Sequence, residues 1–435
     1  MREMTALRSE ARDPRWVVLV GLLLAACVAS TNESASQSPA SEPTVASSPS
    51  VGPGSSPPIS VLPSLDPVSE TFILPDEFAP TLSYVSPDGR FVAARARDYG
   101  RVVLYRITKP SPRPPLSLLT PVAEVRGYAE QISWLEDSSA VLVGTDLDPT
   151  RTLQNHDPSG AGRRIAILNI DGRVVIAPDN AREVIYHRAH ASPDGRWIWV
   201  ADRCCAQQIL LLSRDGSEVR KVVPPASDGA SIGFVGWDRD GYLLYWEAKN
   251  VRSTLVAVDP DGVERYRVPV PTDFRAAGAG VVISAPDRSW LLVEFGGGIG
   301  SSFRARRLLV GRDLRTVPDQ IDRAVYGPFA LGDEIVFGDN TGTLRAYQPL
   351  SGRVRDLPVR LEVARGPSLV GISDGYFVWM ELIRGYVADV QTGRKADLPL
   401  QRRLNVSIVE GARLAEYHFD DNSIVIFDLA MFVKQ

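Results

Sequence analysis

Beyond residue 68, the apolar positions of this chain fall in short runs rich in β-branched and aromatic residues, with polar turn sequences between them. Two of the turns are nearly identical, because Ser86–Ala93 reads SPDGRFVA and Ser192–Ala201 reads SPDGRWIWVA. An Asp-Gly pair supplies the positive φ that a tight hairpin turn requires, so each copy predicts a turn leading into a strand. The pattern therefore predicts an all-β chain built from repeated hairpins.

The turn and its strand return along the rest of the chain, and each copy is followed by a second apolar run that ends in another turn. The units are spaced by roughly 36 to 57 residues, which is typical of four-stranded propeller blades. We therefore expect a β-propeller, with eight four-stranded blades as the first interpretation and seven as the alternative. The first runs are Ser86–Ala93, Trp134–Gly144, Ser192–Ala201, Trp237–Trp246, Ser284–Phe295, Leu331–Gly338, Ser373–Glu381 and Glu410–Phe419. The second runs are Val102–Ile107, Ile165–Gly172, Ile209–Gly216, Thr254–Gly262, Arg307–Asp313, Leu344–Gly352, Tyr386–Gly393 and Ser423–Ala430.

The two ends of this repeat predict how the ring closes. The chain stops soon after the last hairpin, without a final outer strand, and Ser69–Phe78 (SETFILPDEF) precedes the first unit and looks like an outer strand. We expect this segment to complete the last blade, which leaves the ring without a free end.

The hairpin sequences resemble the PD40 blades of the TolB-like and WD40-like propeller superfamily, in which a Trp-Ser-Pro-Asp-Gly turn opens a hairpin. The resemblance spans nearly all of residues 70–435 and is strongest in the two SPDGR copies and in WDRDG at Trp237–Gly241. The separate N-terminal α/β domain of TolB has no counterpart, so a TolB-type role does not carry over.

Residues 1–27 read as an export signal. Several arginines precede the apolar run Trp16–Ala26, which is about as long as a signal-peptide core and too short to span a bilayer comfortably. The run ends in Leu-Ala-Ala-Cys, which resembles the lipobox of bacterial lipoproteins and implies that Cys27 carries lipid. A plain signal peptide or an uncleaved anchor is the alternative. The resemblance implies an extracytoplasmic protein anchored to the bacterial cell membrane.

Residues 28–67 are rich in Ser, Pro, Ala, Thr and Gly and have too little apolar surface to offset the entropy of ordering them. We expect a disordered tether here, followed by the propeller over residues 68–435. The charge balance of the whole chain, 48 Lys+Arg against 52 Asp+Glu for a net charge of −4, disfavours nucleic acid as a partner.

The loops between the second and third strands of each blade should emerge on one face of a propeller, where insertions are tolerated. Most of these loops are short, but Thr145–Arg164 and Gly296–Arg306 are long, and both could instead be surface loops without a role. The candidate ligand contacts on this face are Asp146, Asp148, Arg151, His156, Arg163, Arg164, Arg304 and Arg306.

The adjacent pair Cys204–Cys205 lies in the corresponding loop of the third unit. Adjacent thiols seldom stay reduced outside the cytoplasm, so the pair is a candidate vicinal disulfide, with a buried unlinked pair or an intermolecular bridge as alternatives. Eight-bladed quinoprotein dehydrogenases have a similar feature, and Ala388–Arg394 weakly resembles their blade motif. The docking tryptophan that should follow that motif is missing.

We assign no catalytic, cofactor or metal residues. Gly371–Gly375 (GISDG) fits the nucleophile-elbow pattern, but Ser373 opens a hairpin instead of a helix. His187 and His190 lack the further ligands of a metal site, which favours a surface or packed role. We therefore expect a binding or scaffold module for an envelope protein, peptide or glycan. The alternative is an enzyme that uses the axial funnel, either a glycan hydrolase or lyase or a quinone-dependent oxidoreductase.

Overall fold

All the predicted hairpin strands are confirmed in the computed structural model. Each of the first and second apolar runs overlaps a strand. The structure describes residues 69–108, 118–156, 164–178, 188–189, 191–201, 209–222, 231–249, 252–270, 278–297, 304–310, 314–316, 321, 324–362, 368–381, 384–400, 406–418, 420 and 422–434.

The two SPDGR turns form the same hydrogen-bond network, which explains why their sequences match. The Ser86 hydroxyl donates to Asp88 Oδ1 (2.7 Å) and accepts the N–H of Phe91 (3.0 Å). The Ser192 hydroxyl donates to Asp194 Oδ1 (2.6 Å) and accepts the N–H of Trp197 (2.9 Å). Both glycines that follow the aspartates have φ of +67°. Serine, aspartate and glycine are therefore each required by the turn itself.

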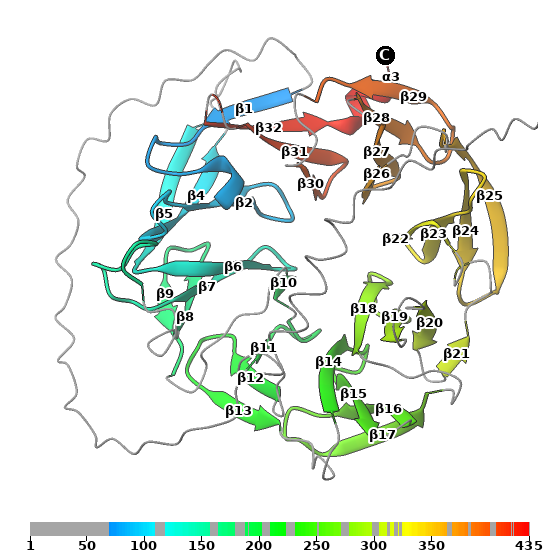
Figure 1. Ribbon diagram of the computed structural model, residues 1–435, viewed down its shortest axis with the longest axis horizontal. Coiled ribbons are helices and arrows are strands. Elements are labelled where there is room, and N and C mark those ends of the chain that lie inside the picture. The colour runs from blue at the N-terminus through cyan, green and yellow to red at the C-terminus, as the bar shows by residue number, and fades with distance from the viewer. Residues whose placement is uncertain are drawn as a thin grey trace, which may run out of the picture. The chain divides into compact units, whose positions relative to one another are not determined.

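Hydrogen bonds group the described strands into eight sheets arranged around a common axis (Figure 1). Sheet 1 contains β2 (Tyr84–Val85), β3 (Phe91–Arg95), β4 (Arg101–Thr108) and β5 (Leu118–Arg126). Sheet 2 contains β6 (Ala129–Leu135), β7 (Ala140–Thr145), β8 (Arg164–Asn169) and β9 (Val174–Ile176), with β10 (Arg188–Ala189) beside β6. Sheet 3 contains β11 (Trp197–Ala201), β12 (Ile209–Ser213) and β13 (Val219–Val222).

The remaining sheets follow in chain order. Sheet 4 contains β14 (Ser231–Trp237), β15 (Leu243–Lys249), β16 (Arg252–Val258) and β17 (Glu264–Pro269). Sheet 5 contains β18 (Gly278–Ser284), β19 (Leu291–Gly297), β20 (Arg304–Val310) and β21 (Leu314–Thr316). Sheet 6 contains β22 (Tyr326–Leu331), β23 (Glu334–Gly338), β24 (Thr343–Gln348) and β25 (Arg353–Arg360). Sheet 7 contains β26 (Ser368–Ser373), β27 (Tyr376–Glu381), β28 (Arg384–Asp389) and β29 (Lys395–Leu398). Sheet 8 contains β30 (Val406–Val409), β31 (Arg413–His418) and β32 (Ser423–Asp428), with β1 (Ser69–Ile73) as its outer strand.

The core lies between the sheets instead of at the axis. Each buried apolar cluster takes its residues from two neighbouring sheets. One cluster lies between every two consecutive sheets along the chain, and one further cluster joins sheet 8 to sheet 1. Every sheet therefore buries both faces, which is why the strands read as nearly continuous apolar runs. This is the predicted all-β propeller.

The count of eight four-stranded blades is corrected at the third unit. Seven sheets contain the four strands of a complete blade, as in the alternative count, whereas sheet 3 has three strands in the described part of the chain. The short strand before it, β10, pairs in parallel with β6, and Ala191 forms an isolated bridge to Ile198 of β11. β10 is two residues long, and its pairing with β6 places it beside sheet 2 instead of in the inner position of sheet 3.

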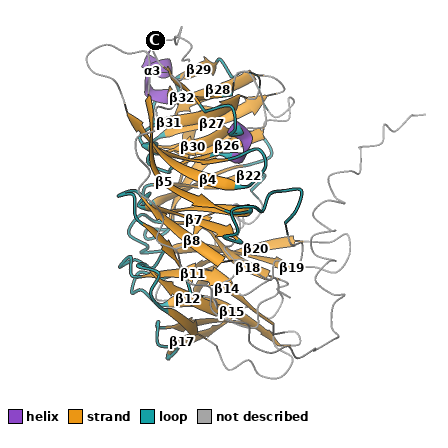
Figure 2. Cartoon of the chain, turned by 90° about the vertical axis from the view of Figure 1, so that its left-hand side faces the viewer, coloured by secondary structure: helices purple, strands orange, loops and turns teal. Residues whose placement is uncertain are grey.

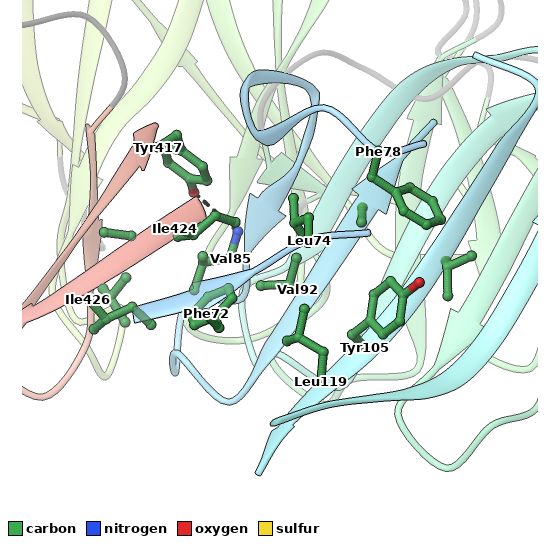
Figure 3. Packing of buried hydrophobic residues seen from close by; sticks show 14 of the residues in the cluster. Phe72, Leu74, Phe78, Val85, Val92, Tyr105, Leu119, Tyr417, Ile424 and Ile426 are labelled. Carbon is green, nitrogen blue, oxygen red and sulfur yellow. Dashed lines mark hydrogen bonds between the residues drawn. The ribbon is translucent and has the colours of Figure 1, made fainter. Parts of the chain in front are cut away.

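The predicted closure of the ring is confirmed. β1 pairs antiparallel with β32 from Ser69 opposite Phe427 to Ile73 opposite Ser423, and Phe72 is fully buried. Figure 3 shows Phe72 among apolar side chains of sheets 1 and 8. A hydrogen bond from the N–H of Val85 to the Tyr417 hydroxyl (3.2 Å) also joins the first and last sheets.

The strand order gives the ring two faces. Connections between second and third strands, together with the links from one sheet to the next, lie on what we call the b–c face. Turns between first and second strands, and between third and fourth strands, lie on the opposite, a–b face.

A short C-terminal helix, α3 (Leu429–Lys434), contacts β28 and β29 of sheet 7 (Figure 2). Among the described helices, none has the length and apolar character needed to cross a membrane.

Candidate functional site

The long β7–β8 connection on the b–c face begins with a folded segment, Thr145–His156, that its own polar side chains hold in shape. Asp146 Oδ1 accepts the N–H groups of Tyr128 (2.8 Å) and Asp148 (3.3 Å). Asp148 Oδ1 accepts the N–H and the hydroxyl of Thr150 (2.9 and 2.7 Å). These side chains accept hydrogen bonds from backbone N–H groups that would be paired with a neighbouring strand if the loop were part of a sheet.

This segment is docked on the neighbouring β3–β4 turn of sheet 1. The N–H of Leu153 donates to the Asp98 carbonyl (2.7 Å). Gly127, in the link between sheets 1 and 2, has φ of +119°, and a Cβ at this position would lie 2.7 Å from the backbone nitrogen of Leu147. Glycine is therefore required for the close approach of the segment.

Four side chains from these elements form a stack, which we call the aromatic column. The guanidinium of Arg95, from β3, lies 4.1 Å from the centre of the Tyr99 ring. Tyr99 is followed by Tyr128 (5.9 Å between centres, 20° between planes), and Tyr128 by His156 (4.1 Å and 14°). Stacked rings and a cation over a ring face each contribute about 0.5–1.5 kcal/mol, so the column ties the segment to the sheet below it.

Arg95 anchors the lower end of the column. It is 5% exposed, and its Nη1 donates to the carbonyls of Ala129 (3.3 Å) and Glu130 (2.7 Å) at the start of β6. Burial lowers the pKa of Arg95 below its usual value because a buried charge loses its hydration. The rings above and the carbonyls beside the guanidinium replace part of that hydration.

His156 closes the upper end of the column and is half-buried. Its Nδ1 lies 2.9 Å from the Leu153 carbonyl oxygen. A carbonyl can only accept, so Nδ1 carries the hydrogen, and the neutral ring has Nε2 as its acceptor. Leu153 beside it is 47% exposed.

The two predicted carboxylates have opposite electrostatic environments. Burial raises the pKa of Asp146 above its ordinary value, although the N–H groups of Tyr128 and Asp148 oppose that shift. The hydroxyl and N–H of Thr150 lower the pKa of Asp148. Because both carboxylates hold the loop backbone, their geometry is that of turn-forming groups and not of an acid–base pair facing a substrate.

The predicted site residues that the structure describes fall into three groups. Asp146, Asp148, Arg151 and His156 are brought together in the folded segment, where Arg151 Nη1 donates to the Asn155 carbonyl (2.6 Å). Arg164 lies at the start of β8, and its Nε and Nη2 donate to the Ala177 carbonyl (3.2 and 2.9 Å), which gives it a structural contact. Arg304 and Arg306 lie in β20, at the end nearest the b–c face. The described residues do not include Arg163, Cys204, Cys205 or Cys27.

Sequence reasoning missed three members of the column, Arg95, Tyr99 and Tyr128. Arg95 carried a signal, because it is the single charged residue of the strand FVAAR, whose positions are all buried. Tyr99 and Tyr128 lie in short connections that gave no such signal.

Within the described ranges, no group of three or more His, Cys, Asp or Glu side chains is placed to hold a metal ion.

Comparison with known proteins gives structural similarity only. No protein-family model matches the chain, and no curated protein sequence matches it. The C-terminal WD40 domain of Sif2 is similar at 12% identity and a TM-score of 0.46, over 83% of this chain and 99% of that one. BamB from Moraxella catarrhalis is similar at 13% identity and a TM-score of 0.44, over 82% and 96%. An oligogalacturonate lyase from Vibrio parahaemolyticus is similar at 14% identity and a TM-score of 0.39, over 59% and 73%.

Proposed function

We propose that this chain is an extracytoplasmic binding module that recognises a partner at the cell envelope through the folded segment Thr145–His156. The observation that carries the proposal is the stack of His156 on Tyr128, which packs the segment against the link between sheets 1 and 2. A binding loop that is already ordered loses less entropy when its partner arrives.

The exposed side of the segment favours a protein or peptide over a glycan. Leu153 is 47% exposed, and the exposed polar residues Gln154 and Asn155 follow it. An apolar side chain inside a neutral polar rim is the usual arrangement of a small protein-contact surface. The charged members, Asp148 and Arg151, pair with each other (3.4 Å) and so shape the loop more than they attract charge.

Attachment of the chain to a membrane through lipid on Cys27 is part of the same proposal. The lipobox-like sequence before Cys27 and the Ser/Pro-rich tether of residues 28–67 support it. A chain of this composition behaves as a flexible linker, so the propeller could reach partners some distance from the membrane surface.

We further propose that the hairpins are PD40-type repeats. The support is the shared network of the Ser86 and Ser192 turns, in which the serine hydroxyl bonds the aspartate two residues later. The third–fourth strand turn at Ser213 uses the same arrangement with Asp215 (2.7 Å).

The proposal is tested by capture of partners from envelope extracts with the full chain and with Leu153→Asp. An exposed charge in place of Leu153 should abolish capture with little change in the melting temperature, because that side chain is 47% exposed and belongs to none of the buried apolar clusters of sheets 1 and 2. The matched control is Val263→Asp, since Val263 is 52% exposed on the a–b face. Equal capture by Leu153→Asp and the native chain would exclude this surface.

A further inference from the structure

A pocket of about 650 Å³ opens on the a–b face, away from the segment discussed above. It lies between the β8–β9 turn of sheet 2 and the β12–β13 turn of sheet 3, and the SPDGR turn before β11 contributes its far wall. None of the sequence motifs pointed to it, because each of its walls reads as an ordinary blade turn.

Four arginines line this pocket: Arg173, Arg196, Arg214 and Arg220. Three carboxylates also line it, and each already has a partner. Asp215 Oδ1 accepts the hydroxyls of Ser213 and Ser217 (both 2.7 Å), and these bonds, with the N–H of Ser217, lower its pKa to about 2. Glu218 pairs with Arg220 (2.6 Å), and Asp171 accepts the N–H of Arg173 (3.0 Å).

Arg214 has the most unusual environment of the four. Its Nη2 donates to the Ser139 hydroxyl, whereas its Nη1 is buried and has no hydrogen-bond partner among the described residues. Burial lowers the pKa of Arg214, Asp137 and Asp171 oppose that shift, and the nearby positive charge of Arg173 adds to it. A buried cationic nitrogen without an acceptor is costly, so the site is incomplete as it stands.

Arg173 and Arg196 add to the positive charge at the rim. Both are exposed, and in the described part of the chain their side chains form no ion pair or hydrogen bond. Arg196 is fixed near Arg214 through its backbone, because its carbonyl accepts the N–H of Arg214 (2.9 Å). Three guanidinium groups without a carboxylate partner therefore share one pocket.

We propose that this pocket binds the oxyanion group of a small molecule, a phosphoryl or carboxylate group, with Arg214 as the central donor and Arg173 and Arg196 at the rim. A guanidinium presents paired N–H donors in a plane, which match the oxygens of these groups. The Asp215 carboxylate stays bound to its serines and forms the floor of the turn.

Isothermal titration of the full chain with inorganic phosphate, citrate and neutral glycerol tests the proposal, and the first two probes separate phosphoryl from carboxylate recognition. We expect binding of phosphate or citrate and none of glycerol. Binding should weaken as sodium chloride is raised, because the rim charges are exposed to screening. Arg214→Gln should weaken binding about tenfold or more, the scale of a lost charge-assisted hydrogen bond. The matched control Arg355→Gln removes an arginine paired with Glu334 on sheet 6 and should leave binding unchanged.

A folding defect in Arg214→Gln would not end the test. The double variant Arg173→Gln/Arg196→Gln alters two exposed side chains and should weaken binding while the melting temperature stays constant. The proposal is overturned if neither phosphate nor citrate binds the native chain, or if both sets of folded variants bind as the native chain does.

Discussion

Phe72→Ala tests whether the ring is held closed by the pairing of its two ends. Phe72 lies in β1, opposite Ile424 of β32, and is fully buried in the cluster between sheets 8 and 1. None of the residues in that cluster belongs to Thr145–His156 or lines the arginine pocket, so the substitution reports on the clasp.

The expected loss of stability follows from that burial. Removing a buried phenyl group forfeits its transfer free energy and leaves a cavity, which together amount to about 3–5 kcal/mol. Thr71→Ala is the control, since Thr71 belongs to the same strand, points to the opposite side and is only partly buried. A substitution there should change the free energy of unfolding by less than about 1 kcal/mol.

Equilibrium unfolding in urea, followed by tryptophan fluorescence, measures both variants. Phe72→Ala should shift the midpoint strongly and Thr71→Ala only slightly. Removal of residues 1–73 should go further, because it exposes the edge of β32 and promotes association between molecules. If Phe72→Ala unfolds at the same urea concentration as Thr71→Ala, the clasp does not hold the ring.

Other predictions concern the anchor, the adjacent thiols and the turns. Cys27→Ala should release the protein from membranes into the soluble fraction, and continued sedimentation with membranes would contradict lipid attachment. Exported protein should gain the mass of two hydrogens on reduction if Cys204 and Cys205 are bonded to each other, and an unchanged intact mass would exclude that bond. The pKa of Asp215 is lowered from 3.8 to about 2, so its contribution to stability is present above 3.8 and is lost as the pH falls toward 2. Asp215→Asn should flatten the pH dependence of the melting temperature in that window, and identical profiles would show that the carboxylate does not stabilise the turn.

The hairpins could be predicted from the sequence because their turns depend on local chemistry. Ser86, Asp88 and Gly89 satisfy one another's backbone and side-chain requirements within a few residues. The closure by β1 was also predictable. The first segment looked like an outer strand with no sheet of its own, and the last sheet had no outer strand, so the two were expected to pair. Both inferences use information that lies within a single repeat or at the two ends.

The aromatic column and the arginine pocket depend on contacts between repeats, which a pattern along the chain does not reveal. Arg95 and His156 come from different parts of the chain and occupy the two ends of one column, where the bond from the Leu153 N–H to the Asp98 carbonyl holds the segment in place. In the sequence, Arg214 looks like any arginine in a blade turn, and its special environment follows only from the neighbouring residues of sheet 2. The pairing of β10 with β6 of the previous sheet could not be inferred from the sequence for the same reason.

The departures from regularity gather around sheets 2 and 3. Sheet 2 carries the long insertion on the b–c face, sheet 3 has three strands in the described part of the chain, and the arginine pocket lies between them on the a–b face. Arg288 of sheet 5 also reaches this region, where it pairs with Glu136 (3.0 Å) and donates to the Ala191 carbonyl (3.3 Å). In a regular repeat, a local loss of the pattern often marks a place where function outweighs packing. Sheets 2 and 3 are therefore where we expect functional sites, on both faces of the ring.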